Sequence, residues 1–306
     1  MLVDELYVNY LVRMCGNMHD VFYFTDVHGQ LDLFQTMRDW CYKQDPECMI
    51  IYGGDACDRG EFGFDIMEMI LDDPQIVYIR GNHEDMFIKA AKEILSEHPE
   101  IADKVLSIKE AEAIIADCGW LRRTQLCLYN GGHPTLKNWM LDGTSTKFVD
   151  QLEERTVLTF ALDNGVCFSH AGGTYECWNR VNSAEYDNTY IDPNDAEDVI
   201  WDRDYLGSWW PKNKIIVFGH TPTTFIHDYV WSTPRMEEND MKPIAYKPTD
   251  KEENGLHIAM DTGMTWTGRG YVLNCLTMQL YGFLDPDVNK IDSKRPVEQF
   301  ENYKII

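Results

Sequence analysis

Aspartate, asparagine and histidine residues recur directly after short apolar runs in this sequence. The residues in these positions are Asp26, His28, Asp55, Asn82, His83, His170 and His220. Their side chains offer oxygen and imidazole nitrogen but no sulfur, a ligand mixture that suits Mn²⁺, Fe or Zn²⁺. Two such ions about 3.5–4 Å apart, bridged by one carboxylate, need about this many ligands. The pattern therefore indicates a site for two metal ions.

Each of these residues also has an ordinary structural interpretation. A single aspartate after a strand is usually a turn or helix-cap residue, an isolated asparagine forms turns, and a lone histidine is commonly a surface or core residue. These interpretations leave unexplained why four of the nine histidines follow apolar runs beside a glycine or a small residue. They also leave the near-equal spacing of Asp26, Asp55 and Asn82 unexplained. We therefore favour the metal-site interpretation.

The apolar runs are typical of buried β-strands, and segments of helical periodicity separate them. The sequence predicts strands at Val21–Phe24, Met49–Tyr52, Ile76–Ile79 and Lys214–Phe218, and helices at 31–41, 64–71 and 86–95. This alternation predicts an α/β protein with parallel strands. Because open α/β sheets bind ligands at the carboxyl ends of their strands, these elements would bring the candidate ligands together.

The remaining sequence predicts further elements around this sheet. Residues 101–128 predict helices, 156–168 a hairpin with an Asn-Gly turn, and 256–260 and 271–283 late strands. Two polar stretches, 176–206 and 227–254, predict surface excursions. We expect a single domain over residues 1–306 with a motif core at about 21–284. Its expected appendages are an N-terminal extension at 1–20, surface insertions at about 176–200 and 227–254, and a C-terminal tail at 285–306.

The composition excludes several classes of protein. With 51 Asp and Glu against 27 Lys and Arg, the formal net charge is −24, which argues against nucleic-acid and anionic-membrane partners. No apolar run reaches the ~18 residues of a membrane-spanning helix, and the start of the chain does not resemble a signal peptide. Nine cysteines without a CxxC pair suit the reduced thiols of a cytoplasmic protein. We expect a cytoplasmic protein, either bacterial or from a phage acting in the host cytoplasm.

Three motifs resemble those of the phosphoprotein phosphatase (PPP) family of metallophosphoesterases, which read GDxHG, GDxxDRG and GNHE. They are Thr25-Asp26-Val27-His28-Gly29, Gly54-Asp55-Ala56-Cys57-Asp58-Arg59-Gly60 and Gly81-Asn82-His83-Glu84. Later motifs resemble the bacterial and bacteriophage branch of that family, which includes the phage lambda protein phosphatase. They are Asn130-Gly131-Gly132, Ser169-His170-Ala171-Gly172, Trp201-Asp202-Arg203, Gly219-His220-Thr221-Pro222 and Asp261-Thr262-Gly263. The resemblance runs in order from about Val21 to Leu280.

The resemblance implies a calcineurin-like metallophosphoesterase fold, with a central β-sandwich of two mixed sheets flanked by helices. It also implies a centre of two divalent metal ions, expected to be Mn²⁺, with Fe or Zn²⁺ as alternatives. The implied ligands of the first ion are Asp26, His28 and Asp55. Asp55 would bridge to the second ion, which Asn82, His170 and His220 would complete.

The same resemblance implies direct attack on phosphorus by a metal-bridging hydroxide. His83 would protonate the leaving oxygen, oriented by Asp58, while Arg59, Arg203 and Asn82 would bind the phosphoryl group. An ion pair of Arg203 with Asp202 or Asp204 is the alternative interpretation of that arginine.

Four positions of the sequence bear on details of this site. Thr25 stands where the family motif usually has glycine, and Cys57 lies close to the expected ligands, either near the metals or as a small buried residue. Tyr205 occupies the place of a second arginine, a change that would favour aryl phosphates. Trp266 follows the last motif and is a candidate for a pocket wall or for the core.

The expected activity is that of a phosphomonoesterase, a protein phosphatase acting on phosphoserine and phosphothreonine, with phosphotyrosine as a further substrate. An alternative is a dinucleoside tetraphosphatase or cyclic-nucleotide phosphodiesterase using the same site. A non-catalytic scaffold is a third alternative, which we disfavour because the chain keeps all six expected metal ligands. The expected partners are phosphorylated proteins or peptides, and the sequence does not determine the oligomeric state.

Overall fold

The structure is a computed structural model that describes residues 19–181, 193–231, 233–237, 241–248, 255–285 and 298–305. Most of the predicted N-terminal extension therefore lies outside the described residues. The same holds for 182–192 and 249–254 of the two predicted insertions and for 286–297 of the predicted tail. The division into one domain with these appendages stays a prediction.

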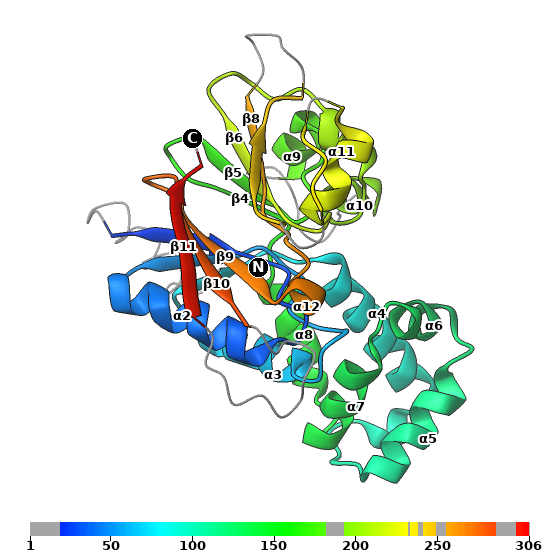
Figure 1. Cartoon of the computed structure of the whole chain (residues 1–306). Helices are drawn as coiled ribbons and strands as arrows, with labels where there is room; N and C mark the ends of the chain where they lie inside the picture. The colour runs from blue at the N-terminus through cyan, green and yellow to red at the C-terminus, as the bar shows by residue number, and fades with distance from the viewer. Residues whose placement is uncertain are drawn as a thin grey trace.

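Two mixed β-sheets form the centre of the described structure (Figure 1). The first has the order β11-β10-β9-β1-β2-β3. Its strands are β1 (Val21–Phe24), β2 (Met49–Tyr52), β3 (Ile76–Tyr78), β9 (Arg269–Asn274), β10 (Gln279–Leu284) and β11 (Glu298–Lys304). Strands β1, β2 and β3 are parallel, as the alternation of strands and helices predicts. Strand β9 joins β1 antiparallel and continues into antiparallel β10 and β11.

The second sheet has the order β4-β5-β6-β8-β7 among the described residues. Its strands are β4 (Thr159–Ala161), β5 (Val166–Ser169), β6 (Ile215–Phe218), β7 (Ile244–Tyr246) and β8 (Leu256–Ala259). Strands β5, β6 and β8 are parallel, and β4 and β7 are antiparallel edges. The predicted hairpin is confirmed as the β4–β5 pair.

The two sheets pack face to face because their strands alternate their apolar side chains between two sides. Val21 and Tyr23 of β1 belong to one buried cluster with Phe168, Val217 and Ile258 of the second sheet. The intervening residues of β1, with Ile50 and Tyr52 of β2, face the opposite way into a cluster with helices. The predicted sandwich of two mixed sheets flanked by helices is confirmed.

Helices cover the outer faces of both sheets (Figure 1). Those of the first two thirds are α2 (Leu31–Gln44), α3 (Gly63–Asp72), α4 (Asn82–Glu97), α5 (Ile108–Cys118), α6 (Arg122–Tyr129), α7 (His133–Asp142) and α8 (Thr146–Arg155), with the short 3-10 helix η1 (Pro99–Ile101). Those of the last third are α9 (Tyr175–Val181), α10 (Pro193–Ile200), η2 (Asp204–Gly207), η3 (Thr223–Phe225), α11 (Ile226–Tyr229) and α12 (Met264–Thr267). No helix in the described part of the chain is both long and apolar enough to cross a membrane.

Three predicted elements differ from the structure in informative ways. Helix α4 begins at Asn82, four residues before the predicted start, because Glu84 accepts a hydrogen bond from the Gly81 backbone and completes the first turn. In the first polar stretch, Trp178 is buried and meets Trp210 edge to face, with 5.8 Å between ring centroids. In the second, Ile244–Tyr246 forms the edge strand β7. These stretches are therefore surface excursions only in part, because their few aromatic and aliphatic residues pack on the second sheet.

Candidate metal centre

The predicted ligands follow the carboxyl ends of strands from both sheets, and several adopt a strained backbone. The φ angles of Asp26, His28, Asp55 and His220 are 58°, 44°, 57° and 62°. Left-handed backbone is costly for residues other than glycine and persists where the surroundings fix it. Backbone bonds fix it here, since Asp26 donates its N–H to Gly54 O at 3.0 Å and His28 donates to Asp55 O at 3.0 Å. These hydrogen bonds keep the backbone in a conformation that directs the side chains toward one point.

Glycine is required beside two of these carboxylates. A Cβ atom at Gly219 would overlap with Asp26 Oδ2, and a Cβ atom at Gly81 would overlap with Asp55 Oδ1. The glycines that accompany His220 and Asn82 in the sequence motifs therefore leave room for the carboxylates of other strands. This explains the glycines that precede His220 and Asn82 in the sequence.

Each predicted histidine ligand places one ring nitrogen within hydrogen-bond distance of a backbone carbonyl oxygen, and its other ring nitrogen faces the cluster. The Nδ1 atoms of His28 and His170 lie 2.9 Å from Cys57 O and 2.8 Å from Gly53 O. His220 places Nε2 at 3.0 Å from Trp201 O. Ligating histidines commonly donate their second N–H in this way, which fixes the tautomer and the ring. The arrangement fits residues prepared to bind metal.

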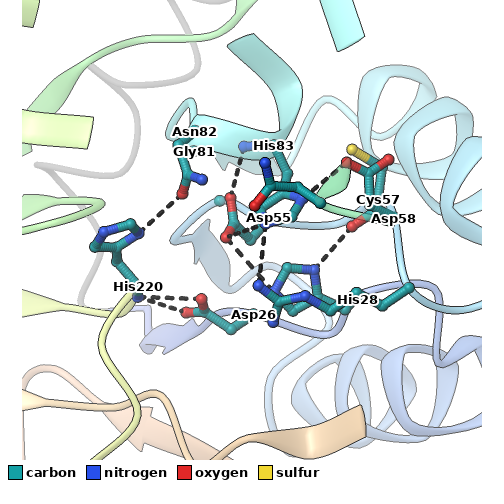
Figure 2. A network of polar contacts seen from close by, with 12 residues as sticks. Asp26, His28, Asp55, Cys57, Asp58, Gly81, Asn82, His83 and His220 are labelled. Carbon is teal, nitrogen blue, oxygen red and sulfur yellow. Dashed lines mark hydrogen bonds and ion pairs between the residues drawn. The ribbon is translucent and has the colours of Figure 1, made fainter. Parts of the chain in front are cut away.

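The second ring nitrogens converge on Asp55 and Asn82, and Figure 2 shows the contact of His220 with Asn82. Asn82 Oδ1 lies 2.8 Å from His220 Nδ1 and 3.0 Å from His170 Nε2. The two oxygens of Asp55 lie 3.2 Å from His170 Nε2 and 3.5 Å from His28 Nε2. Two groups of potential ligand atoms share Asp55, one with His28 and His83 and one with His170 and His220, and the atoms of each lie within 4.8 Å of one another. Nitrogen and oxygen donors gathered this closely around one carboxylate fit the expected binuclear site.

Asp26 joins the cluster through His220. The backbone N–H of His220 donates to both carboxylate oxygens of Asp26, at 3.1 and 3.2 Å, as Figure 2 shows. The Thr25 hydroxyl donates to Asp26 Oδ2 at 2.7 Å. Threonine at this glycine position of the motif therefore adds a hydrogen bond to the carboxylate.

The buried charges set the protonation of the cluster. Burial lowers the pKa of His28 and of His220 well below the ordinary value, so both rings are neutral as metal ligands must be. Burial raises the pKa of Asp55, but the nearby His170 and His83 hold it well below the ordinary range. For Asp26, burial and the neighbouring Asp261 raise the pKa. Bound cations would complement this buried negative charge.

His83 is held by a separate pair of contacts. Its Nδ1 lies 2.7 Å from Asp58 Oδ2, and its backbone N–H donates to Asp55 Oδ1 at 3.1 Å. The other oxygen of Asp58 accepts from the Thr135 hydroxyl at 2.8 Å. Burial lowers the pKa of His83, but the carboxylates of Asp55 and Asp58 outweigh this and hold it above the ordinary value. An oriented imidazole of raised pKa is suited to proton donation.

Two supporting residues were not assigned a role from the sequence. Thr135 lies on α7, far along the chain from Asp58, and no local pattern marks it. Glu84 is part of the third motif, Gly81-Asn82-His83-Glu84, and this position was the only sign in the sequence that it supports the site. Its fully buried carboxylate accepts hydrogen bonds from Tyr78 OH and from three backbone N–H groups, those of Asp55, Ala56 and Gly81. Glu84 therefore fixes the loop that carries Asp55.

The two predicted arginines meet at a cavity of about 470 Å³ beside the cluster. The cavity is lined by Arg59, Arg203, His220, Pro222, Phe225, Asp228, Tyr229, Thr265 and Trp266. Arg59 Nη2 lies 3.1 Å from His83 Nε2, and Arg203 Nη2 donates to His220 O at 3.4 Å. Within the described residues, Arg203 forms no ion pair with Asp202 or Asp204. The guanidinium groups of both arginines therefore adjoin the candidate ligands.

The remaining departures from the family motifs lie near the cluster in different ways. Cys57 is fully buried, and burial raises the pKa of its thiol, so it behaves as a small core residue whose backbone carbonyl orients His28. Tyr205 lies in η2 and does not line this cavity. Trp266 does line it, in agreement with the pocket-wall interpretation.

Residues 20–249 match the family of calcineurin-like phosphoesterases, whereas no curated protein matches the chain. Three similar solved structures are 11–15% identical to this chain. A protein whose suggested activity is diadenosine tetraphosphatase matches with a TM-score of 0.43, covering 86% of this chain and 92% of that chain. A cold-active protein-tyrosine phosphatase of a psychrophilic Shewanella species matches with 0.43, covering 92% and 80%. A protein serine/threonine phosphatase from Saccharomyces cerevisiae matches with 0.39, covering 94% and 80%.

The likeness to the solved structures concerns the fold alone, and the bacterial and bacteriophage branch stays a prediction. The family match extends over well more than half of the chain and includes the first three motifs, His170, Arg203 and His220. This chain therefore belongs to the calcineurin-like phosphoesterase family.

Proposed function

We propose that this chain is a metal-dependent phosphomonoesterase that removes phosphate from serine, threonine or tyrosine side chains of proteins. The observation that carries the proposal is the cavity that Arg59, Arg203 and His220 share. Planar guanidinium groups suit the paired oxygens of a phosphoryl group. A phosphoryl group held there would lie directly against the cluster around Asp55 and Asn82.

The proposed metal ligands are the six side chains predicted from the sequence. Asp26, His28 and Asp55 would hold one divalent ion, and Asp55 would share the second with Asn82, His170 and His220. We propose Mn²⁺ as the resident metal, on the strength of the mixed oxygen and nitrogen donors. When bound, two such ions activate water for attack on phosphorus and neutralise charge on the transferred group.

The remaining residues of the site position the substrate and supply a proton. Arg59 and Arg203 would orient the phosphoryl oxygens, and Asn82, which contacts the cavity-lining His220, would contribute a further contact. His83 lies beside Arg59, so a phosphoryl group bound by that arginine would present its leaving oxygen near His83 Nε2. The carboxylate of Asp58 keeps the ring oriented and favours its protonated form.

The charge of the whole chain narrows the substrate class. With a formal net charge of −24, the protein repels long polyanions, while its local arginines attract a single phosphate group. We therefore propose neutral or basic phosphorylated peptides as partners rather than nucleic acids or anionic membranes. The eight described cysteines are all buried, and none of them forms a disulfide bond within the described residues, which supports the proposed cytoplasmic location.

The test is a substrate panel with Mn²⁺ that compares phosphopeptides, dinucleoside polyphosphates and 2′,3′-cyclic nucleotides. We expect hydrolysis of phosphopeptides and of para-nitrophenyl phosphate, about two metal ions per chain, and loss of hydrolysis in Asp55→Asn and His83→Asn. Asp39→Asn, on an exposed carboxylate outside the site, is the matched control. Hydrolysis of dinucleoside polyphosphates or cyclic nucleotides without phosphopeptides would overturn the substrate proposal. A folded, metal-loaded chain that hydrolyses none of these substrates would support the scaffold alternative.

A further inference from the structure

Three aromatic side chains line the cavity beside the two arginines, and all three remain substantially exposed. The exposed fractions are 47% for Phe225, 42% for Tyr229 and 39% for Trp266. Exposed aromatic groups gathered in one concave site are characteristic of binding surfaces rather than of ordinary protein surface. Phe225, Tyr229 and Trp266 therefore form an aromatic wall in the same cavity as Arg59 and Arg203.

The aromatic wall is built from two segments of the chain, one after strand β8 and one after strand β6. Trp266 packs so closely on Gly263 that a Cβ atom at Gly263 would overlap with the indole ring, and Gly263 has a left-handed φ of 61°. Gly263 in turn donates its N–H to Asp261 Oδ1 at 2.8 Å. Trp266 is thereby fixed to the loop that follows strand β8.

Phe225 and Tyr229 lie in η3 and α11, which follow strand β6. The same segment contains His220, and Phe225 donates its backbone N–H to Pro222 O at 2.8 Å. Thr223 N–H donates to Asp261 O at 2.8 Å, so the two loops are joined by a backbone hydrogen bond. The backbone segments that carry the three rings are therefore joined to each other and to the segment that carries His220.

We propose that this aromatic wall binds the phenyl ring of phosphotyrosine and makes it the preferred substrate of the site. The inference rests on the proposed phosphomonoesterase function and specifies its substrate. In phosphotyrosine the ester oxygen is bonded directly to the ring, so a phosphoryl group held by Arg59 and Arg203 places that ring next to the wall. Phosphoserine has a single carbon at this place and would leave the rings uncovered.

The charges of the cavity favour an aromatic monoester over a nucleotide. Asp228 is part of the lining, close to Phe225 and Tyr229 in the sequence, and its carboxylate lies 3.7 Å from Arg235. A dinucleoside polyphosphate would carry further negative charges beyond the phosphate at the metal cluster, and these would meet Asp228 in a chain of net charge −24. It also places a ribose between its phosphate and its base. A single phosphate joined directly to a ring would place the phosphate at the arginines and the ring at the aromatic wall.

The test measures binding of phenylphosphonate and methylphosphonate to the Mn²⁺-loaded protein by calorimetry. Neither compound is hydrolysed, so leaving-group reactivity does not enter the comparison. We expect Trp266→Ala to weaken the binding of phenylphosphonate about five- to tenfold, which lies within the range of aromatic pair energies, and to change the binding of methylphosphonate less than about twofold. Trp266→Phe should restore most of the loss. Trp231→Ala, on a residue that is 86% exposed and outside the cavity, should change neither.

Peptides of one sequence, carrying phosphotyrosine or phosphoserine, then test the preference. We expect Trp266→Ala to lower the ratio of their kcat/KM values about five- to tenfold, with the phosphoserine value nearly unchanged. Equal losses for both phosphonates, or an unchanged peptide ratio, would overturn the inference while leaving the phosphomonoesterase function intact. Tighter, Trp266-dependent binding of diadenosine tetraphosphate would also overturn it. Absence of any monoester hydrolysis would instead overturn the proposed function, and the binding measurement would still report on the aromatic wall.

Discussion

His83 Nδ1 lies 2.7 Å from Asp58 Oδ2, and both side chains are buried. Asp58 is itself fixed by Thr135, whose hydroxyl donates to the second carboxylate oxygen. These contacts orient the His83 ring, whose Nε2 lies 3.1 Å from Nη2 of Arg59, a residue that lines the cavity. This relationship gives His83 its place in the proposed reaction as a group that acts on the leaving oxygen.

Replacing Asp58 with asparagine should lower kcat by about 10- to 100-fold, because outer partners that orient a functional histidine contribute this much. The loss should be larger for an alkyl phosphate than for para-nitrophenyl phosphate, since the nitrophenolate leaves without protonation. Steady-state rates on both substrates check this. Equal losses on the two substrates would contradict proton donation by His83 and would leave Asp58 a structural role.

Metal binding should release a proton from His170. Burial lowers the pKa of His170, but the carboxylates of Asp55 and Asp26 outweigh it and raise the pKa to about 10 in the metal-free protein. A metal ligand must be neutral, so the apparent Mn²⁺ affinity should rise with pH above neutrality. Calorimetry in buffers of different ionisation enthalpy measures the protons released. Metal binding to the His170→Asn variant should release about one proton fewer at pH 7.5. Equal proton release by the two proteins would contradict the assignment of His170 as a metal ligand.

The same raised pKa makes the stability of the metal-free protein depend on pH. The folded state binds the His170 proton more tightly than the unfolded chain, so the contribution is fully present below about pH 6.5. It should be lost as pH rises from about 6.5 to about 10. Denaturant unfolding of the chelator-treated protein across this range measures the loss, and the slope should be shallower in the His170→Asn variant.

Thr25→Val should weaken metal binding by up to about tenfold, because valine keeps the shape of threonine but cannot donate to Asp26 Oδ2. Thr25→Ser keeps the hydroxyl and should bind metal nearly as the parent does. Direct titration with Mn²⁺ measures the metal affinity of both variants and of the parent protein. The prediction is wrong if valine and serine bind metal with the same affinity.

Glu84→Gln should reduce the free energy of unfolding by about 3 kcal/mol, because a buried charged acceptor is replaced by an amide that turns a donor toward a backbone N–H. Glu97→Gln, on the exposed end of the same helix, is the matched control. Urea unfolding measures both. A loss no larger than that of the control would show that Glu84 does not support the Asp55 loop.

The parts of the fold that the sequence predicted are those with a local pattern. Strands β1, β2 and β6 are short apolar runs, and the helices that separate them have their own periodicity, so their existence could be read from neighbouring residues. The start of α4 was misplaced because Asn82 and His83, which suggest only a metal site, also occupy its first turn. Strand β7 was missed because an edge strand of three residues has too few positions to show alternation.

The sequence by itself determined which residues are candidates for the site and in what order they occur, because the motifs place Asp26, Asp55 and His170 directly after strands. Only the tertiary structure decided how they meet. It brings Thr135 to Asp58, places the Glu84 carboxylate beneath the Asp55 loop, and joins Trp266 to Phe225 in one wall. These contacts cross long distances along the chain and depend on packing between the sheets and their helices. A local pattern carries no information about such contacts, so the aromatic wall that suggests phosphotyrosine emerged only from the fold.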